Sequence, residues 1–354
     1  MSEEIRLAMI GVGNCASALV QGLAYYDQVG GDIGLMHRDL GGYDVTDIKP
    51  VVAFDVNARK VGRDIADAIF APPNNAYRVP DVEVKPTGVK VLMGPVEDGA
   101  PPHLAKYMEI ADCEPVDVVQ ALKDAGVEVM LNMLPTGSAR AARLYAQAAL
   151  DAGVAFVNGM PELIVSGDES FVQAAEERGV PLVGDDTKSQ LGGTVLHRAM
   201  VECMLARGIR IKKTYQLNYA GNTDFDNLVH RGESKEKTKR EAVEALISYD
   251  AGVSAAFAHV PNMRDRKTTR FYFELSNFSD APMVVDAKLE VEDSANFGGI
   301  VSDAIRCCRL ALDRGIGGTL VSASAYFSKH PPVQIPDQQA LEMLEEFIQG
   351  KRER

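Results

Sequence analysis

The chain has 354 residues, of which 46% are hydrophobic and 25% are charged, so it is long enough for two globular domains. Its formal net charge of −13 argues against nucleic acid or an anionic membrane as the main partner, because either would need a basic surface. The five cysteines form no C-x-x-C pair and no apolar run could cross a bilayer, so we expect a cytoplasmic protein without structural zinc or disulfides.

Short apolar runs alternate with helical patterns through the first half of the chain. Strands are predicted at 5–10, 51–55, 127–133, 154–159 and 180–184. Helices are predicted from about Asn14, up to Ile69 and from Ser138. Because the strands are apolar on both faces, they favour a Rossmann-like, doubly wound parallel sheet. The stretch 71–115 is rich in Pro, Gly and Asn, and we interpret it as an insertion on that sheet because it holds the apolar run 89–93.

The pattern changes after a helix predicted at about 190–206. The runs 213–219, 268–275 and 283–291 alternate polar and apolar residues, as half-buried antiparallel strands do. Loops and one helix separate these runs. The second half of the chain therefore predicts a second domain of the α+β type.

The last segment resembles the first domain again. A helix is predicted from about Ala295, a strand-like run at 317–326, and a final helix at 336–349. We therefore predict a Rossmann-like domain at 1–200, an inserted second domain at 201–294, and a return to the first domain at 295–354.

A dinucleotide-binding loop is predicted between the first strand and the first helix, where Gly11-x-Gly13-x-x-Ala16 occurs. Gly11 permits the tight turn, and Gly13 lets backbone N–H groups approach a pyrophosphate at the helix N-terminus. Asp55 ends the strand 51–55, and we interpret it as the ribose ligand, which favours NAD over NADP. The alternative is a glycine-rich turn that binds no nucleotide.

Three polar loops follow other predicted strands. The loop 132–142 contains Pro135 and Gly137, and the stretches 184–194 and 218–228 are rich in Asp, Asn, Ser and Gly. Each could be an ordinary capped turn. Their position at strand ends favours a binding site, because parallel sheets bind ligands at that edge.

The basic run "RGESKEKTKREA" at 231–242 places Lys235 and Lys239 four residues apart on one helix face. An exposed cation near a helix N-terminus destabilises the helix by about 0.3–1 kcal/mol, because that end of the helix dipole is positive. A bound phosphate would make these cations favourable, because it would interact with the lysines and the helix N–H groups together. The run alone favours a solvated face, because glutamates are interspersed. Lys267 and Lys329 lie beside predicted strands, and each is either a surface residue or a cleft lysine with a shifted pKa.

The stretches "GVGNCAS", "GDDTKSQ", "QLNYAGNTDFDNL", "SKEKTK", "RDRK", "KLEVEDS" and "SASAYFSKHPP" occur in this order. With them, essentially the whole chain resembles inositol-1-phosphate synthase (myo-inositol-3-phosphate synthase) in its shorter bacterial and archaeal form. The resemblance implies a homotetramer that uses NAD and depends on a cation of unknown identity, with the inserted domain 201–294 carrying both the active site and the tetramer interface. It also implies cyclisation of glucose 6-phosphate to inositol monophosphate by oxidation at C5, enolisation, aldol closure and reduction.

The resemblance also implies the site residues. It assigns Lys267 and Lys329 to the C5 oxygen, and Lys235 and Lys239 to the phosphate and the C1 carbonyl. The rest of the pocket would be Asp186, Ser189, Asn218, Asn222, Asp224, Leu228 and Asp293. Cofactor contacts are expected at Gly11, Gly13, Asn14, Cys15, Asp55, Asn132, Pro135, Thr136, Gly137, Asp186, Ser189, Asp224 and Lys235, and, outside any motif, at Asp64, Ala125 and Tyr145.

The chain departs from the long eukaryotic form, which reads G-G-N-N-G at the dinucleotide loop and K-S-G-Q-T after the paired acids. Here these stretches are "GVGNCAS" and "KSQLGGT", so the alignment around Gln190 stays open. Two other functions remain as alternatives: a net NAD-dependent dehydrogenase of a phosphorylated sugar or polyol, and a catalytically silent NAD-binding sensor.

Overall fold

Seven parallel strands form the larger sheet in the computed structural model, which describes residues 4–354. The strand order is β13-β8-β7-β6-β1-β4-β5, and every neighbouring pair is parallel. The strands are β1 (Ile5–Ile10), β4 (Ile48–Asp55), β5 (Val91–Met93), β6 (Val129–Asn132), β7 (Ala155–Asn158), β8 (Pro181–Val183) and β13 (Gly318–Thr319). The prediction of a doubly wound parallel sheet is confirmed.

Helices cover both faces of this sheet. Successive side chains of a strand point to opposite faces, and here both sets are apolar, so each face is buried under helices. In β1, Leu7 and Met9 pack into one core, whereas Ala8 and Ile10 pack into the other. The first core includes α1 (Asn14–Gln28), α2 (Ile65–Ala68), α9 (Asp293–Asp313), α10 (Val321–Phe327) and α11 (Asp337–Ile348). The second includes α3 (Val118–Asp124), α4 (Ala139–Ala152) and α5 (Glu169–Glu177).

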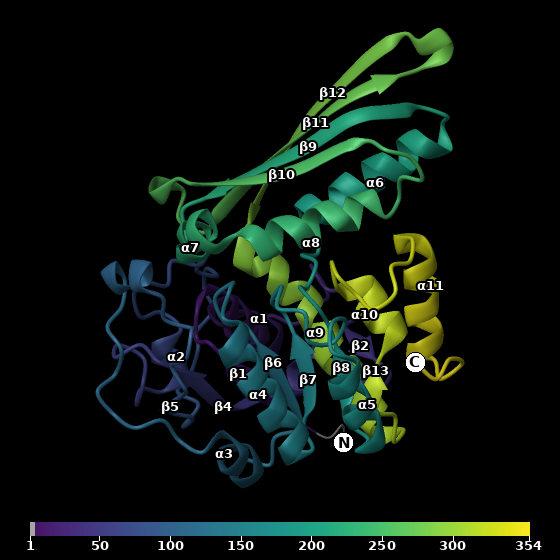
Figure 1. The fold of residues 1–354 in the computed structure, drawn as a ribbon. Coiled ribbons are helices and arrows are strands. Elements are labelled where there is room, and N and C mark those ends of the chain that lie inside the picture. The colour runs from purple at the N-terminus through teal and green to yellow at the C-terminus, as the bar shows by residue number, and fades with distance from the viewer. Residues whose placement is uncertain (1–3) are drawn as a thin grey trace.

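A four-stranded sheet forms a separate layer beside the carboxyl ends of the parallel strands (Figure 1). It has the order β10-β9-β11-β12, with β9 (Arg210–Ala220), β10 (Gly252–His259), β11 (Arg266–Ser276) and β12 (Pro282–Glu292). One face packs on α6 (Gly193–Ala206) and α8 (Glu233–Glu244) through Val201, Val243, Phe271 and Phe273. A further helix, α7 (Thr223–Arg231), follows β9.

These four strands lie in sequence between β8 and β13, which are neighbours in the larger sheet. The chain leaves the parallel sheet through α6 and returns through α9, which packs against α1. The remaining elements are short: β2 (Asp39–Leu40), β3 (Tyr43–Asp44), η1 (Val45–Asp47), η2 (Pro102–Lys106), η3 (Pro261–Met263) and η4 (Phe278–Asp280). None of the helices within residues 4–354 combines the length and apolar character needed to cross a membrane.

The structure corrects three element predictions. The strand-like run 317–326 contains only the two residues of β13 and then becomes α10, so Lys329 follows a helix and not a strand. The loop predicted to continue to 228 is α7 from Thr223 onward. A fourth strand, β10, joins the three that were predicted in the second sheet. The apolar run 89–93, in contrast, does add an edge strand, β5, to the parallel sheet.

Candidate active site

A cavity of about 180 Å³ lies where the carboxyl ends of the parallel strands meet the second sheet. The loops after β1, β6, β7 and β8 contribute Gly13, Pro135, Met160 and Asp186 to its wall. The opposite wall comes from α7, α8, β11 and the start of α9. The strand order reverses between β1 and β6, and open α/β sheets bind ligands at this point.

The glycine loop fits a dinucleotide. Gly11 has φ +85°, and a Cβ there would lie 2.8 Å from the Met133 carbonyl oxygen. A Cβ on Gly13 would meet nothing within 4 Å, so space remains above the N-terminus of α1. No side chain caps that end and no acid lies in its first turn. Its backbone N–H groups are therefore oriented to hold an anion such as a pyrophosphate.

Asp55 lies at the end of β4, in a second cavity of about 120 Å³. This cavity shares Gly13, Met133 and Pro135 with the first, so the two form one groove. The Asp55 carboxylate accepts a 2.8 Å hydrogen bond from the backbone N–H of Val12 in the glycine loop. The carboxylate is thereby fixed beside the loop, in the position of a ribose ligand.

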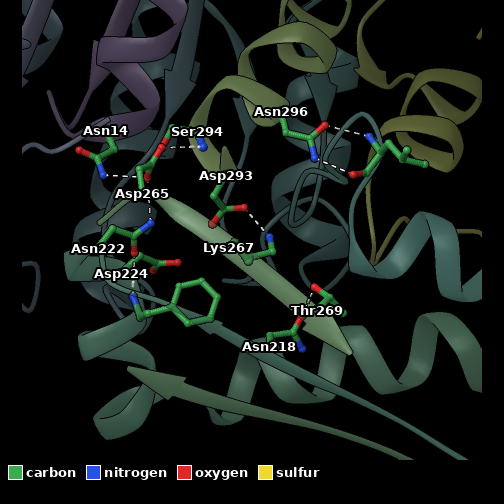
Figure 2. Close-up of polar contacts among 12 residues, drawn as sticks. Asn14, Asn218, Asn222, Asp224, Asp265, Lys267, Thr269, Asp293, Ser294 and Asn296 are labelled. Carbon is green, nitrogen blue, oxygen red and sulfur yellow. Dashed lines mark hydrogen bonds and ion pairs between the residues drawn. The ribbon is translucent and has the colours of Figure 1, made fainter. Parts of the chain in front are cut away.

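Four lysines converge on the first cavity from α8, β11 and the loop after α10. Three of them meet a carboxylate that also lines the cavity. The pairs are Lys235–Asp224 at 2.7 Å, Lys329–Asp186 at 2.5 Å and Lys267–Asp293. Figure 2 shows Lys267 on β11 pointing toward Asp293 at the start of α9.

Lys239 differs from the other three because its partners are neutral. Its ammonium donates to Gln216 Oε1 at 3.1 Å and to Asn218 Oδ1 at 3.2 Å, while its side chain is buried. Among residues 4–354 no carboxylate forms an ion pair with it. Lys239 is thus buried without a carboxylate in direct contact, and an anion bound in the cavity would favour its charged form.

Burial and neighbouring charges shift these lysines in different directions. Burial and the ammonium groups of Lys267, Lys329 and Lys235 lower the pKa of Lys239 well below its ordinary value. Burial also lowers the pKa of Lys329, although Asp186 opposes that change. Burial alone would lower the pKa of Lys235, but Asp224 and Asp186 outweigh it and raise that pKa. Lys235 is therefore a fixed cation, whereas Lys329 can exchange a proton more readily.

Asp186 is held in an unusual backbone conformation, with φ +61°, which non-glycine residues seldom adopt. Its carbonyl oxygen accepts from the Lys329 backbone N–H at 2.7 Å. Its carboxylate accepts from Thr238 Oγ1 at 2.6 Å as well as from the Lys329 ammonium. These contacts fix the carboxylate opposite Lys329, and such rare backbone angles cluster at functional sites.

Most of the sequence-predicted residues line one of the two cavities. The first is lined by Gly13, Asn14, Cys15, Pro135, Asp186, Ser189, Asn222, Asp224, Leu228, Lys235, Lys239, Lys267, Asp293 and Lys329. The second adds Gly11, Asp55 and Tyr145. Gln190, around which the alignment was open, instead donates to the Gly34 carbonyl oxygen in a different depression.

Four predicted residues lie directly behind the cavity wall. Asn132 accepts from the Leu134 backbone N–H, and Asn218 accepts from Lys239. The Thr136 carbonyl oxygen accepts from Asn227, and the Gly137 N–H donates to Glu162. These residues shape the loops and side chains that reach the ligand.

Asp64 and Ala125 lie in neither cavity. The Asp64 carboxylate caps α2 and accepts from the backbone N–H groups of Thr87 and Gly88. Ala125 ends α3, and its carbonyl oxygen accepts from Arg6. Their local roles are structural, and the geometry gives no support for cofactor contacts at these positions.

Asp265 is a central polar residue that sequence reasoning missed. Its buried carboxylate accepts from Asn14, Asn222 and Ser294, so it joins the glycine loop, the start of α7 and the start of α9 (Figure 2). Burial and the neighbouring Asp293 raise its pKa to about 6. The only local signal is its place two residues before Lys267.

Two other cations of the basic run, Lys237 and Arg240, face solvent. Lys237 and Arg240 pair with Glu241 and Glu244 one helical turn further along α8, at 3.8 and 3.5 Å. Lys235 and Lys239 turn inward to the cavity. The run therefore divides between two faces of α8, with Lys235 and Lys239 on the cavity side and Lys237 and Arg240 on the solvent side.

The comparisons with known proteins agree with this geometry. A family model described as myo-inositol-1-phosphate synthase matches residues 192–294. Over 99% of its length the chain is 47% identical to an inositol-3-phosphate synthase of Mycobacterium tuberculosis (strain CDC 1551), of which the match covers 97%. It is 46% identical to an inositol-3-phosphate synthase of Mycolicibacterium smegmatis over 98% of both chains.

A crystal structure of inositol-3-phosphate synthase from Caenorhabditis elegans has the same fold, with a TM-score of 0.78 at 16% identity. The alignment covers 98% of this chain and 86% of that one. The full-length identities above, rather than this likeness of fold, establish common descent. The chain therefore belongs to the myo-inositol-1-phosphate synthase family.

Proposed function

We propose that this protein is an inositol-3-phosphate synthase, an isomerase that cyclises D-glucose 6-phosphate to 1L-myo-inositol 1-phosphate. The observation that carries the proposal is the group of four cavity lysines with only three carboxylate partners. A substrate phosphate would supply the countercharge that Lys239 lacks. The names of its full-length relatives support the same activity.

NAD is the cofactor of this proposal, and the groove fits it. The N–H groups at the start of α1 would hold the pyrophosphate, and Asp55 would hold a ribose. When bound there, NAD⁺ would supply the hydride acceptor for oxidation at C5, and its reduced form the hydride donor for the last step, so no NADH would accumulate.

Lys329 and Lys267 would lie at the C5 oxygen. The lowered pKa of Lys329 suits it to accept the C5 hydroxyl proton during oxidation and to return it during reduction. Lys267 would remain paired with Asp293 and stabilise negative charge on that oxygen during enolisation. The Asp186 carboxylate would hold the Lys329 amino group in place throughout, in both its neutral and its protonated form.

Lys235 and Lys239 would bind the phosphate and the C1 carbonyl oxygen. Lys239, which has no carboxylate partner, would meet the phosphate, and Lys235, held charged by Asp224, would stabilise the alkoxide that forms at O1 in the aldol step. The phosphate is bonded through O6 to C6 itself, so one of its oxygens can accept the C6 proton. The proposal therefore needs no separate protein base.

The cation implied by the resemblance has no evident protein site. Within residues 4–354 no group of three or more His, Cys, Asp or Glu side chains could hold a metal ion. No step of the proposed reaction is assigned to a metal.

The experiment that tests the function uses purified protein, glucose 6-phosphate labelled with ¹³C and a catalytic amount of NAD⁺. We expect the NMR spectrum to show inositol phosphate while the absorbance of NADH stays flat. If NADH instead accumulated with the substrate consumed, the protein would be a net dehydrogenase. A spectrum without product and without NADH would exclude both activities.

We also propose that the chain divides into a NAD-binding domain at 1–200, an inserted domain at 201–294, and a return to the first domain at 295–354.

We further propose a homotetramer that uses the outer face of the second sheet as an interface. That face exposes Tyr215 and Leu217 on β9 and Val284 on β12, each at least 36% exposed. Exposed apolar side chains on a sheet face favour association. Light scattering is expected to give about four times the 38.3 kDa chain mass, and Leu217→Glu should lower it; an unchanged mass would place the interface elsewhere.

A further inference from the structure

Two short segments pair as an antiparallel ribbon at the edge of the cavity. Asp185 and His330 exchange backbone hydrogen bonds of 3.0 and 3.1 Å, and the Lys329 N–H donates to the Asp186 carbonyl oxygen. The side chains of Asp186 and Lys329 line the cavity, whereas those of Asp185 and His330 do not. The ribbon therefore presents the Asp186–Lys329 pair to the ligand and His330 to other partners.

The His330 ring joins two elements on the far side of the ribbon. Its Nδ1 lies 3.0 Å from Ser166 Oγ, and its Nε2 lies 3.1 Å from Glu241 Oε2 on α8. Nδ1 lies against the Ser166 hydroxyl, which itself donates to the Asp185 carboxylate. The Glu241 carboxylate can only accept, so it accepts from Nε2, and this bond is charge-assisted because its acceptor is ionised.

Glu241 lies three residues after Thr238, on the same side of α8. The Thr238 hydroxyl donates to the Asp186 carboxylate on the cavity side. The ribbon thus holds α8 at two points, one inside the site and one outside it. Lys235 and Lys239 lie on the same helix, so its position also sets theirs.

We propose that His330 is a positioning residue that holds α8 against the ribbon, so that all four lysines and Asp186 face one substrate. Without the bond between His330 and Glu241, the C-terminal part of α8 loses its attachment to the ribbon. The Thr238 hydroxyl then moves with the helix and orients Asp186 less firmly. The catalytic consequence rests on the proposed function, but the closure of α8 does not.

Two substitutions at one position separate the two arms of the ring. The amide nitrogen of Asn lies near the place of Nδ1, so His330→Asn keeps a polar contact with Ser166 and loses the donor to Glu241. The amide nitrogen of Gln lies near the place of Nε2, so His330→Gln keeps the donor to Glu241. Glu241→Gln weakens the same bond from the helix side, without altering the ribbon.

Hydrogen–deuterium exchange of the α8 amides and steady-state kinetics provide the readouts. We expect His330→Asn and Glu241→Gln to increase the exchange rate of the α8 amides by about fivefold and to lower kcat more than they raise KM. In His330→Gln, both the exchange rate and kcat should stay within about twofold of the wild-type values. The double variant His330→Asn/Glu241→Gln should match His330→Asn alone, because both changes break one bond. Lys237→Ala, which removes a solvent-facing neighbour of Glu241, is the matched control and should change neither readout.

The proposal would be overturned if the α8 amides exchanged at the same rate in His330→Asn as in the wild type. It would also be overturned if His330→Asn and His330→Gln changed the exchange rate and kcat equally. Additive effects in the double variant would overturn it as well. Exchange needs no substrate, so a wild-type protein that forms no inositol phosphate would refute the proposed function alone. In that case faster α8 exchange in His330→Asn would still support the positioning role.

Discussion

Lys329→Met is expected to lower turnover of glucose 6-phosphate by about 10³-fold or more, because it removes both a proton carrier and a positive charge beside C5. Methionine keeps most of the volume of the buried side chain, so the cavity should not collapse. NAD affinity should change by less than about twofold, since the glycine loop and Asp55 do not contact Lys329. Lys267→Met should behave in the same way.

Single-turnover kinetics and calorimetric titration with NAD⁺ would measure the two effects separately. Lys188→Met is the matched control, because Lys188 is also buried and lies two residues from Asp186. Its ammonium points away from the cavity to Asp337 at 2.8 Å. We expect this control to keep turnover within about tenfold of wild type. If Lys329→Met retained near-normal turnover, the proposed role of Lys329 would be wrong.

The parallel sheet could be predicted from the sequence because its strands are apolar on both faces and each is followed by a helical pattern. Two elements, β10 and α10, could not be predicted, and the reasons are opposite. The stretch "GVSAAFAH" is rich in alanine, which has low strand propensity, yet it forms β10 through its pairing with β9. The run "VSASAYF" alternates like a strand but forms α10, whose small residues are buried on nearly all sides. A helix without a polar face has no readable helical period.

The candidate site also has features that could be predicted from the sequence and features that could not. The glycine loop could be recognised from its own spacing, whereas the four lysines were assigned to the site only through the resemblance of their motifs to a known family. The pairings were not predictable from any motif, because Lys329 and Asp186 are 143 residues apart. Asp265 bonds to Asn14 across 251 residues, and only the fold brings them together. The fold likewise separates Asp64 and Ala125 from the groove, which the order of residues could not reveal.

Lys239→Met is expected to abolish the reaction and yet raise the temperature of unfolding by about 2–4 °C, because the wild-type protein buries this amino group without a carboxylate partner. The two acceptors that lose the lysine keep other donors. Gln216 Oε1 still accepts from Asn218, and Asn218 Oδ1 still accepts from Thr269. The substitution therefore leaves no buried acceptor without a partner, and stability gained at the expense of activity is typical of a functional residue.

Lys235→Met is the matched control, and it should act in the opposite direction. Lys235 is paired with Asp224, so its removal leaves a carboxylate beside the cavity without its ammonium, and unfolding should occur at a lower temperature. Calorimetry with and without inorganic phosphate would measure both effects. Phosphate should stabilise the wild-type protein and fail to stabilise Lys239→Met, because the anion binds where Lys239 lacks a countercharge. A Lys239→Met protein that unfolds below the wild type would show that its ammonium is already compensated within the fold, and the argument for a phosphorylated substrate would lose its main support.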